Sequence, residues 1–271
     1  MSADNGKRSA LAAFRIATRL GYLLGLPFVL LATWWLLTAD STSFFWPPLS
    51  TILKVLPETW FGDRLQADVG PSVARLLTGY TIALVVAVAG GVAIGLSRTL
   101  RALTEPTLEF FRAVPPPVLV PVIALFAGYT GSTSKIVTIA LGCLWPILLN
   151  TVEGVRGLDE VYLDTARCFQ FSRRSRLLHV VLRGASPQIV AGARQALSIG
   201  VILMVISELF GAERGLGASI VQFQRSFAIP QMWTGIIVLG LLGSLLSLLF
   251  RFVEHGVLAW YRGLRNADRG A

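Results

Sequence analysis

Five polar residues lie inside long apolar segments of this chain, and they carry different functional groups: Asn150, Arg194, Ser198, Ser207 and Glu208. Polar and ionisable groups are costly in segments that cross a lipid bilayer, and there they mark pathways or contacts with one another. An amide, a guanidinium, a carboxylate and two hydroxyls could bind a small polar solute and pass it across. We therefore treat these five residues as candidates for lining a path through a membrane.

Each candidate also has a structural interpretation. Arg194 lies close enough to one end of its segment for its guanidinium to reach the lipid headgroups. The carboxylate of Glu208 could pair with Arg214 or accept hydrogen bonds from backbone amides of the turn at residues 215–217. We favour this role for Glu208, because a bare carboxylate would repel an anionic solute. The two serines are weaker candidates, since serine hydroxyls often donate to carbonyls of their own helix.

The sequence offers little for catalysis, metal binding or a cofactor. The pattern Gly-x-x-x-x-Gly-Lys-Ser/Thr, whose backbone cradles nucleotide phosphates, does not occur, so the chain by itself is not expected to be an enzyme. His179 and His255 have no ligand-spaced Cys, Asp or Glu nearby, so no metal site is expected. Cys143 falls in an apolar segment and Cys168 in a polar loop, which makes a disulfide between them implausible.

Composition predicts an all-α, polytopic membrane protein. Hydrophobic residues make up 54% of the 271 residues and charged residues 14%, against about 25% charged residues in a soluble domain. Apolar runs of roughly 20 residues predict membrane-spanning helices. Six transmembrane helices are expected, at about 21–37, 73–96, 114–128, 136–151, 189–210 and 232–253. The third is short and rich in proline.

Small residues recur every four positions in two of the expected spans: Gly91 and Gly95 in the second, and Gly192, Ala196 and Gly200 in the fifth. Small side chains let two helices approach closely, which is one way that spans associate in lipid. Packing within one subunit is the simpler explanation of these stripes. Contact between two copies of the chain is the alternative.

Between the fourth and fifth spans, residues 153–188 form a polar loop with helical periodicity. A first helix, which Asp159 is placed to cap, has Tyr162, Ala166 and Phe169 on one face. A second short helix can start at Ser172. Two amphipathic helices on one side of a membrane indicate a surface that docks against another protein.

Charge placement predicts the orientation and the domain boundaries. Seventeen Lys and Arg residues flank the spans on one side and five on the other, so the docking loop and both termini are expected in the cytoplasm. The net charge of +9 is then a topology signal rather than a nucleic-acid site, which would need a basic soluble domain. The expected division is a cytoplasmic arm 1–20, an anchor helix 21–37, an extracytoplasmic loop 38–69, a transmembrane domain 70–254 and a cytoplasmic tail 255–271.

The docking loop resembles the cytoplasmic loop of permease subunits of ATP-binding-cassette importers, whose pattern is Glu-Ala-Ala, three residues, Gly, nine residues, Ile, one residue, Leu-Pro. The residues in register with it are Asp164, Thr165 and Ala166, then Gln170 after Arg167 and two further residues, then Val180, Leu182 and Arg183. Ser207-Glu208-Leu209, Gly215-Leu216-Gly217, Gly157-Leu158-Asp159 and Trp260 are also similar to this family. The resemblance covers roughly residues 70 to 260, and within the family it is greatest to nitrate, sulfonate and taurine permeases.

The resemblance implies the fold of a type I importer permease in a prokaryotic cytoplasmic membrane. It also implies a second copy of the chain, a cytoplasmic ATPase subunit that holds the ATP, and an extracytoplasmic binding protein that delivers the substrate. The implied substrate is a small anion such as a sulfonate, taurine or nitrate, and a pyrimidine-type vitamin precursor is an alternative. A competing class is an ion-coupled secondary transporter, which predicts an inverted repeat. No such repeat is seen in this sequence.

Overall fold

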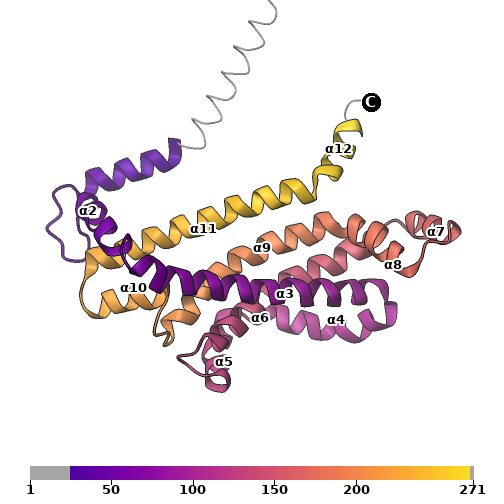
Figure 1. The fold of residues 1–271 in the computed structure, drawn as a ribbon, viewed down its shortest axis with the longest axis horizontal. Coiled ribbons are helices and arrows are strands. Elements are labelled where there is room, and N and C mark those ends of the chain that lie inside the picture. Colours follow the sequence, from indigo (N-terminus) through magenta and orange to yellow (C-terminus); the bar gives the residue numbers. More distant parts are fainter. Residues whose placement is uncertain (1–24, 269–271) are drawn as a thin grey trace, which may run out of the picture.

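The computed structural model describes residues 25–268, and every regular element in this range is helical (Figure 1). The expected arm 1–20 and the start of the expected anchor helix therefore lie outside the described residues, and that helix is seen as Gly25–Thr38. The elements that follow are α2 (Leu49–Trp60), η1 (Leu65–Val69), α3 (Gly70–Leu96), α4 (Arg98–Ala113), η2 (Pro116–Leu119), α5 (Val120–Ala127), α6 (Ser132–Arg156), α7 (Glu160–Cys168), α8 (Arg173–Ser175), η3 (Arg176–Val181), α9 (Leu182–Leu209), α10 (Leu216–Arg225), α11 (Ile229–Val257) and α12 (Ala259–Asp268).

Four helices of the described chain are long and apolar enough to cross a membrane: Leu65–Leu96, Ser132–Arg156, Arg173–Leu209 and Ile229–Val257. At about 1.5 Å per residue each exceeds the roughly 30 Å of a hydrocarbon core. A fifth crossing is possible if the bent pair α4 and η2–α5 counts as one broken span. Gly25–Thr38 is a shorter apolar helix. The predicted membrane protein is confirmed, whereas the count of six spans is not.

The expected third span, residues 114–128, is wrong as a single helix. Its prolines divide it, because a proline lacks the backbone donor and disfavours helical geometry in the residue before it. The chain is extended at Val114 and Pro115, and the helix resumes as the short η2 and α5. Arg98–Ala113, which was expected to be a loop, is an amphipathic helix that meets Pro116–Ala127 at 86°. Pro146 does not interrupt α6.

The core forms where α6 packs between α3 and α9, and these three helices lie side by side in Figure 1. The glycine stripes explain the close approach. A Cβ added at Gly91 would lie 2.6 Å from the Cβ of Thr151 on α6, and one at Gly95 would lie 2.7 Å from the Cβ of Val155. On α9, a Cβ at Gly192 would lie 2.7 Å from the Cβ of Asn150. These glycines therefore face α6 of the same chain.

The docking loop is continuous with a membrane helix. Arg173–Leu209 is one helical stretch of 37 residues that includes α8, the π-helical η3 and α9. The helix that contains the expected fifth span thus begins inside the docking loop. The short helix expected to start at Ser172 is the first part of this long helix and not a separate element. Because Ser172 accepts a hydrogen bond from the amide of Ser175 at 3.2 Å, the start predicted at Ser172 is correct.

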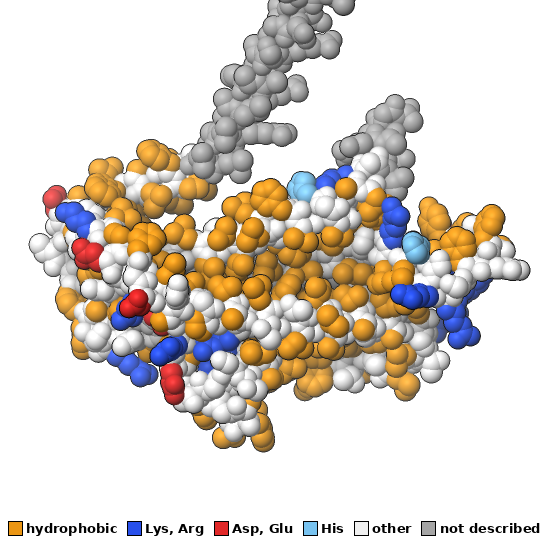
Figure 2. Space-filling model, in the orientation of Figure 1, with side chains coloured by type: hydrophobic (Ala, Val, Ile, Leu, Met, Phe, Trp, Pro, Cys, Tyr) orange, Lys and Arg blue, Asp and Glu red, His pale blue; other side chains and the backbone are white. Residues whose placement is uncertain are grey.

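The two ends of the molecule differ in their elements. The helices α7, α8 and α12 lie at one end of the long axis, and α2 and α10 lie at the other (Figure 1). Trp60 of α2 joins α11 by donating to the hydroxyl of Thr234 at 2.9 Å. In Figure 2 a broad hydrophobic surface separates charged side chains gathered toward the two ends, as expected for a protein that lies across a bilayer.

Candidate functional site

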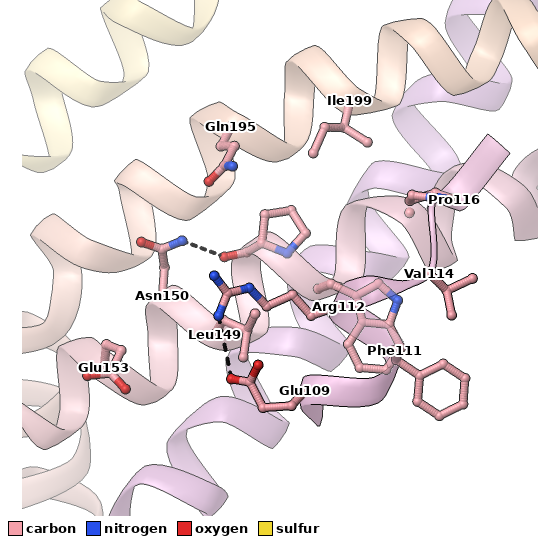
Figure 3. Close-up of a pocket in the computed structure, with 13 residues that line it drawn as sticks. Glu109, Phe111, Arg112, Val114, Pro116, Leu149, Asn150, Glu153, Gln195 and Ile199 are labelled. Carbon is pink, nitrogen blue, oxygen red and sulfur yellow. Dashed lines mark hydrogen bonds and ion pairs between the residues drawn. The ribbon is translucent and has the colours of Figure 1, made fainter. Parts of the chain in front are cut away.

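A cavity of about 440 Å³ opens between α4, α6 and α9 (Figure 3). Gln195 of α9, Asn150 of α6 and Arg112 of α4 point toward it and supply an amide, a second amide and a guanidinium. Two carboxylates, Glu109 and Glu153, also belong to its lining. Three helices that are distant in sequence thus bring hydrogen-bonding groups to one face of the membrane domain.

The apolar wall of this cavity contains a stacked aromatic pair. The ring centroids of Phe111 and Trp145 are 5.1 Å apart with only 8° between the ring planes. Phe111 is near the end of α4, just before the proline break, whereas Trp145 is in the middle of α6. The stack therefore holds the end of the broken segment against α6 and fixes one side of the cavity.

The lining carboxylates are partnered. The guanidinium of Arg112 lies 3.5 Å from the carboxylate of Glu109, and that of Arg156 lies 2.8 Å from Glu153. Asn150 donates from its side-chain nitrogen to the carbonyl of Pro146 at 2.8 Å and keeps its side-chain oxygen available as an acceptor. The cavity is therefore a mixed polar surface rather than a concentrated positive site.

The predicted path residues do not form one site. Only Asn150 lines this cavity. Arg194 lies 3.6 Å from the carboxylate of Glu254 on α11, which is a different contact from the predicted reach to lipid headgroups. Ser198 is exposed on α9, and Ser207 is buried and donates to the carbonyl of Met204. Gln195, one residue after Arg194, is the residue of this segment that faces the cavity.

Glu208 belongs to a buried polar cluster at the α10 end of the molecule. Its carboxylate accepts hydrogen bonds from the hydroxyl of Ser72, from the backbone amide of Gly217 at 3.0 Å and from the guanidinium of Arg75 at 2.9 Å. The side chains of Arg75 and Glu208 are 9% and 0% exposed. The favoured structural role of Glu208 is thus consistent with its contacts, but its cationic partner is Arg75 and not Arg214, which accepts from Arg75 through its backbone carbonyl.

Arg75 and Ser72 are the residues that sequence reasoning missed. Arg75 also donates to the hydroxyl of Ser132 at 3.0 Å, so the cluster joins α3, the start of α6, α9 and the turn before α10. The sequence did contain a signal for Arg75, because a single arginine near the end of an otherwise apolar span needs a partner. Lys135, which is also buried, donates to the carbonyl of Tyr129 in the same region.

At the other end, the predicted docking residues lie on α7 and the turn that follows it. Asp159 caps α7 as expected, accepting from the amide of Val161 at 2.9 Å. Asp164 and Arg167 form an exposed ion pair with an N–O distance of 2.6 Å. Thr165 is exposed and donates to the carbonyl of Val161 at 2.7 Å, whereas Ala166 is buried and packs α7 against the body of the protein.

Gln170 has a backbone conformation that explains the glycine of the family pattern. Its φ is +53°, in the left-handed region that favours glycine. Its amide donates to the carbonyl of Arg167, and the amide of Phe171 donates to the carbonyl of Ala166 at 3.0 Å. These two bonds are the Schellman arrangement that ends a helix with a left-handed residue. The turn after α7 therefore forms with glutamine, although a side chain there is strained.

The chain matches the family described as "Binding-protein-dependent transport system inner membrane component" over residues 79–258. It belongs to this family. As an inner membrane component, it is a multi-pass membrane protein that serves transport, and the assignment does not favour an ion-coupled secondary transporter. The match ends at residue 258, immediately before α12 begins at Ala259.

Relatives of this permease are similar along most of its length. The taurine transport system permease protein TauC of Escherichia coli is 31% identical over 86% of this chain and 87% of its own length. The putative aliphatic sulfonates transport permease protein SsuC of Bacillus subtilis is 28% identical, covering 93% and 91%. The bicarbonate transport system permease protein CmpB of Synechococcus elongatus is 30% identical, covering 73% of each chain.

The fold is also shared with a solved structure. A chain of the inward-facing MetNI methionine ABC transporter superimposes with a TM-score of 0.61 and 19% identity, over 70% of this permease and 94% of that chain. At this identity the likeness establishes the fold alone. It confirms the expected ABC-importer permease architecture for the transmembrane domain.

Proposed function

We propose that this permease forms half of the membrane path of an ATP-driven importer for a small anion of the sulfonate, taurine or nitrate class. The observation that carries the proposal is the polar cavity between α4, α6 and α9. Gln195 is exposed in the middle of a 28-residue membrane helix, and Asn150 is only partly buried beside it. Amide groups are expensive to expose to hydrocarbon, so this face contacts water, a solute or protein rather than lipid.

A second copy of the chain would complete this path. The glycine stripes are already used in packing α3 and α9 against α6, whereas the polar cavity face of α4, α6 and α9 stays open to another subunit. Two such faces opposed across an axis would enclose the polar groups that one copy leaves open. This arrangement supports the homodimer. The balance of Lys and Arg residues supports a cytoplasmic position for both termini and the docking loop.

The cavity chemistry suits transit better than tight binding. Its lining contains one guanidinium, that of Arg112, against the carboxylates of Glu109 and Glu153, so an anion would be held weakly. Weak contact is what a conducting path requires, because the solute must leave as readily as it enters. Selection of the substrate would then rest mainly with the extracytoplasmic binding protein. The relatives named for taurine, aliphatic sulfonates and bicarbonate support a small anion as the class.

The ATPase subunit would dock on α7, and Asp164, Thr165, Ala166, Arg167 and Gln170 would transmit its closure to the spans. Because the helix that starts at Arg173 is unbroken as far as Leu209, a displacement of the docking loop would move α9 along with it. Glu208 sits near the far end of that helix. One rigid element therefore links the docking surface, the cavity wall and the buried cluster.

The test is growth of a strain that lacks this permease, with taurine or an alkanesulfonate as sole sulfur source and with nitrate as sole nitrogen source. We expect loss of growth on one of these anions, restored by the parent chain and by Asp164→Glu. Asp164→Lys should reach the membrane in equal amount and fail to restore growth, since it sets like charges against Arg167 and inverts the exposed charge of α7. Normal growth on all the anions, with a defect only when a thiamine precursor is limiting, would overturn the anion assignment.

A further inference from the structure

We propose that the C-terminal helix α12 is part of the surface that receives the ATPase subunit, with Trp260 and Tyr261 as one wall of the docking groove. The inference rests on the proposed function, because it assumes that α7 meets an ATPase. It goes beyond that function, because α12 lies outside the docking loop at residues 153–188.

The groove is lined by residues of α7, η3, α9 and α12. It has a volume of about 710 Å³, and its lining residues come from α7 and the turns on either side of it, from η3 and the start of α9, and from α12. Tyr162 and Phe169 contribute from the side of α7, Arg183 and Gly184 from α9, and Trp260 with Tyr261 from α12. The start of the C-terminal helix thus lies beside the docking loop.

A specific contact holds α12 in this place. The guanidinium carbon of Arg183 lies 5.3 Å from the centre of the Trp260 ring, within the range of a cation–π interaction. Trp260 in turn meets the Tyr261 ring edge to face at 5.7 Å. Arg183 is the residue that stands at the proline of the family pattern, so this chain has replaced a helix-breaking residue with one that fixes the C-terminal helix.

Three aromatic side chains of the groove are exposed within the described part of the chain. Tyr162 is 65% exposed, Phe169 74% and Phe171 46%. Clustered exposed apolar side chains rimmed by charge mark a site of association. Arg183 belongs to the groove lining, and Arg167, Arg173 and Arg174 lie on α7 and α8 of the same loop. Because this loop carries the largest group of arginines in the sequence, we expect the patch to lie outside the membrane core.

An ATPase surface is the occupant that fits. The groove continues the exposed side of α7 around Thr165, so a protein seated on α7 covers both. An amphipathic helix bound to lipid would turn its aromatic residues to the membrane, whereas Trp260 and Tyr261 line a concave groove shared with α7. The expected complement is an apolar or aromatic side chain inserted into the groove, flanked by acidic residues that face the arginines.

The test measures the affinity of the purified partner ATP-binding subunit for the full-length permease in lipid nanodiscs. We expect Trp260→Ala to weaken binding about tenfold, as for an aromatic anchor, and Trp260→Phe to weaken it by less than about threefold, because a ring remains for Arg183. Arg183→Gln should weaken binding in the parent chain and have no further effect beside Trp260→Ala, since both changes remove one contact.

The controls separate this inference from the proposed function. Asp164→Lys should abolish binding if α7 is the docking helix; binding that survives both Asp164→Lys and Trp260→Ala would refute the ATPase docking surface as a whole. Loss with Asp164→Lys but unchanged affinity with Trp260→Ala would overturn the role of α12 alone. A Trp260→Ala effect that appears only in nanodiscs containing phosphatidylglycerol, and not in zwitterionic ones, would assign the helix to lipid and also overturn it.

Discussion

The buried ion pair between Arg75 and Glu208 should dominate the stability of the α10 end, and Arg75→Met tests this. The guanidinium and the carboxylate lie 2.9 Å apart, and their side chains are 9% and 0% exposed. Removing the arginine leaves a buried carboxylate that keeps its bonds from Ser72 and Gly217 but loses its ion-pair partner. Breaking a buried pair from one side costs about 3–5 kcal/mol, a change of two to more than three powers of ten in the unfolding equilibrium.

The double variant Arg75→Met/Glu208→Gln distinguishes charge from packing. Glutamine keeps a side-chain oxygen that can accept from Ser72 and Gly217, while both charges are gone. We expect it to recover most of the stability lost in Arg75→Met, because replacing both members of a buried pair is often nearly neutral. The measurement is the free energy of unfolding of each variant, from the loss of helical circular dichroism as sodium dodecyl sulfate is added to mixed micelles.

A matched control comes from the pair Arg156–Glu153. Its N–O distance of 2.8 Å is almost the same, but its side chains are 41% and 64% exposed. Arg156→Met should therefore lower the free energy of unfolding by at most about 1 kcal/mol. The reasoning is refuted if Arg75→Met is no worse than Arg156→Met, or if the double variant is as unstable as Arg75→Met alone.

Three further predictions follow from the structure. Gly91→Ala should lower the free energy of unfolding by about 1–3 kcal/mol, because the added methyl group overpacks against Thr151. In the control Gly90→Ala the Cβ would lie 3.4 Å from its nearest neighbour, so the free energy of unfolding should change by less than about 1 kcal/mol. Equal effects of the two variants would contradict close packing at Gly91. Gln170→Gly should strengthen the turn after α7 by about 1 kcal/mol, seen as slower amide hydrogen exchange in α7, and faster exchange would count against it. Ser175→Cys, in a Cys-free background, should resist a membrane-impermeant thiol reagent in intact cells that labels Ser226→Cys; labelling of Ser175→Cys would reverse the proposed orientation.

Much of this protein was predictable from local sequence alone. Apolar runs longer than a bilayer is thick specify spanning helices, so the second, fourth, fifth and sixth spans appear where hydropathy placed them. The start of α7 at Asp159 and the helix start after Ser172 also follow from local signals, because a cap is satisfied by amides within three residues. The residue spacing around Asp164 indicated the permease family, and membership of that family implies the fold and the transport class.

Local sequence could not predict how the third segment is arranged. Prolines predict that a helix breaks, but the direction of the next helix depends on the residues that it packs against. Here Phe111 stacks on Trp145 of α6, and η2–α5 leaves α4 at 86°. A hydropathy window averages over such a break and reports one span.

The partner of Glu208 was decided only by tertiary structure. Arg75 lies 133 residues earlier in the chain, and nothing local distinguishes it from Arg214, which is close in sequence. The same holds for the glycine stripes, whose contacts with α6 depend on how the helices pack, and for Arg183, which meets Trp260 only because the start of α12 lies beside the start of α9. The sequence shows which polar groups need a partner, because a polar group in a long apolar segment loses contact with water when that segment enters the membrane. Which partner they obtain is set by the packing of helices that are distant in sequence.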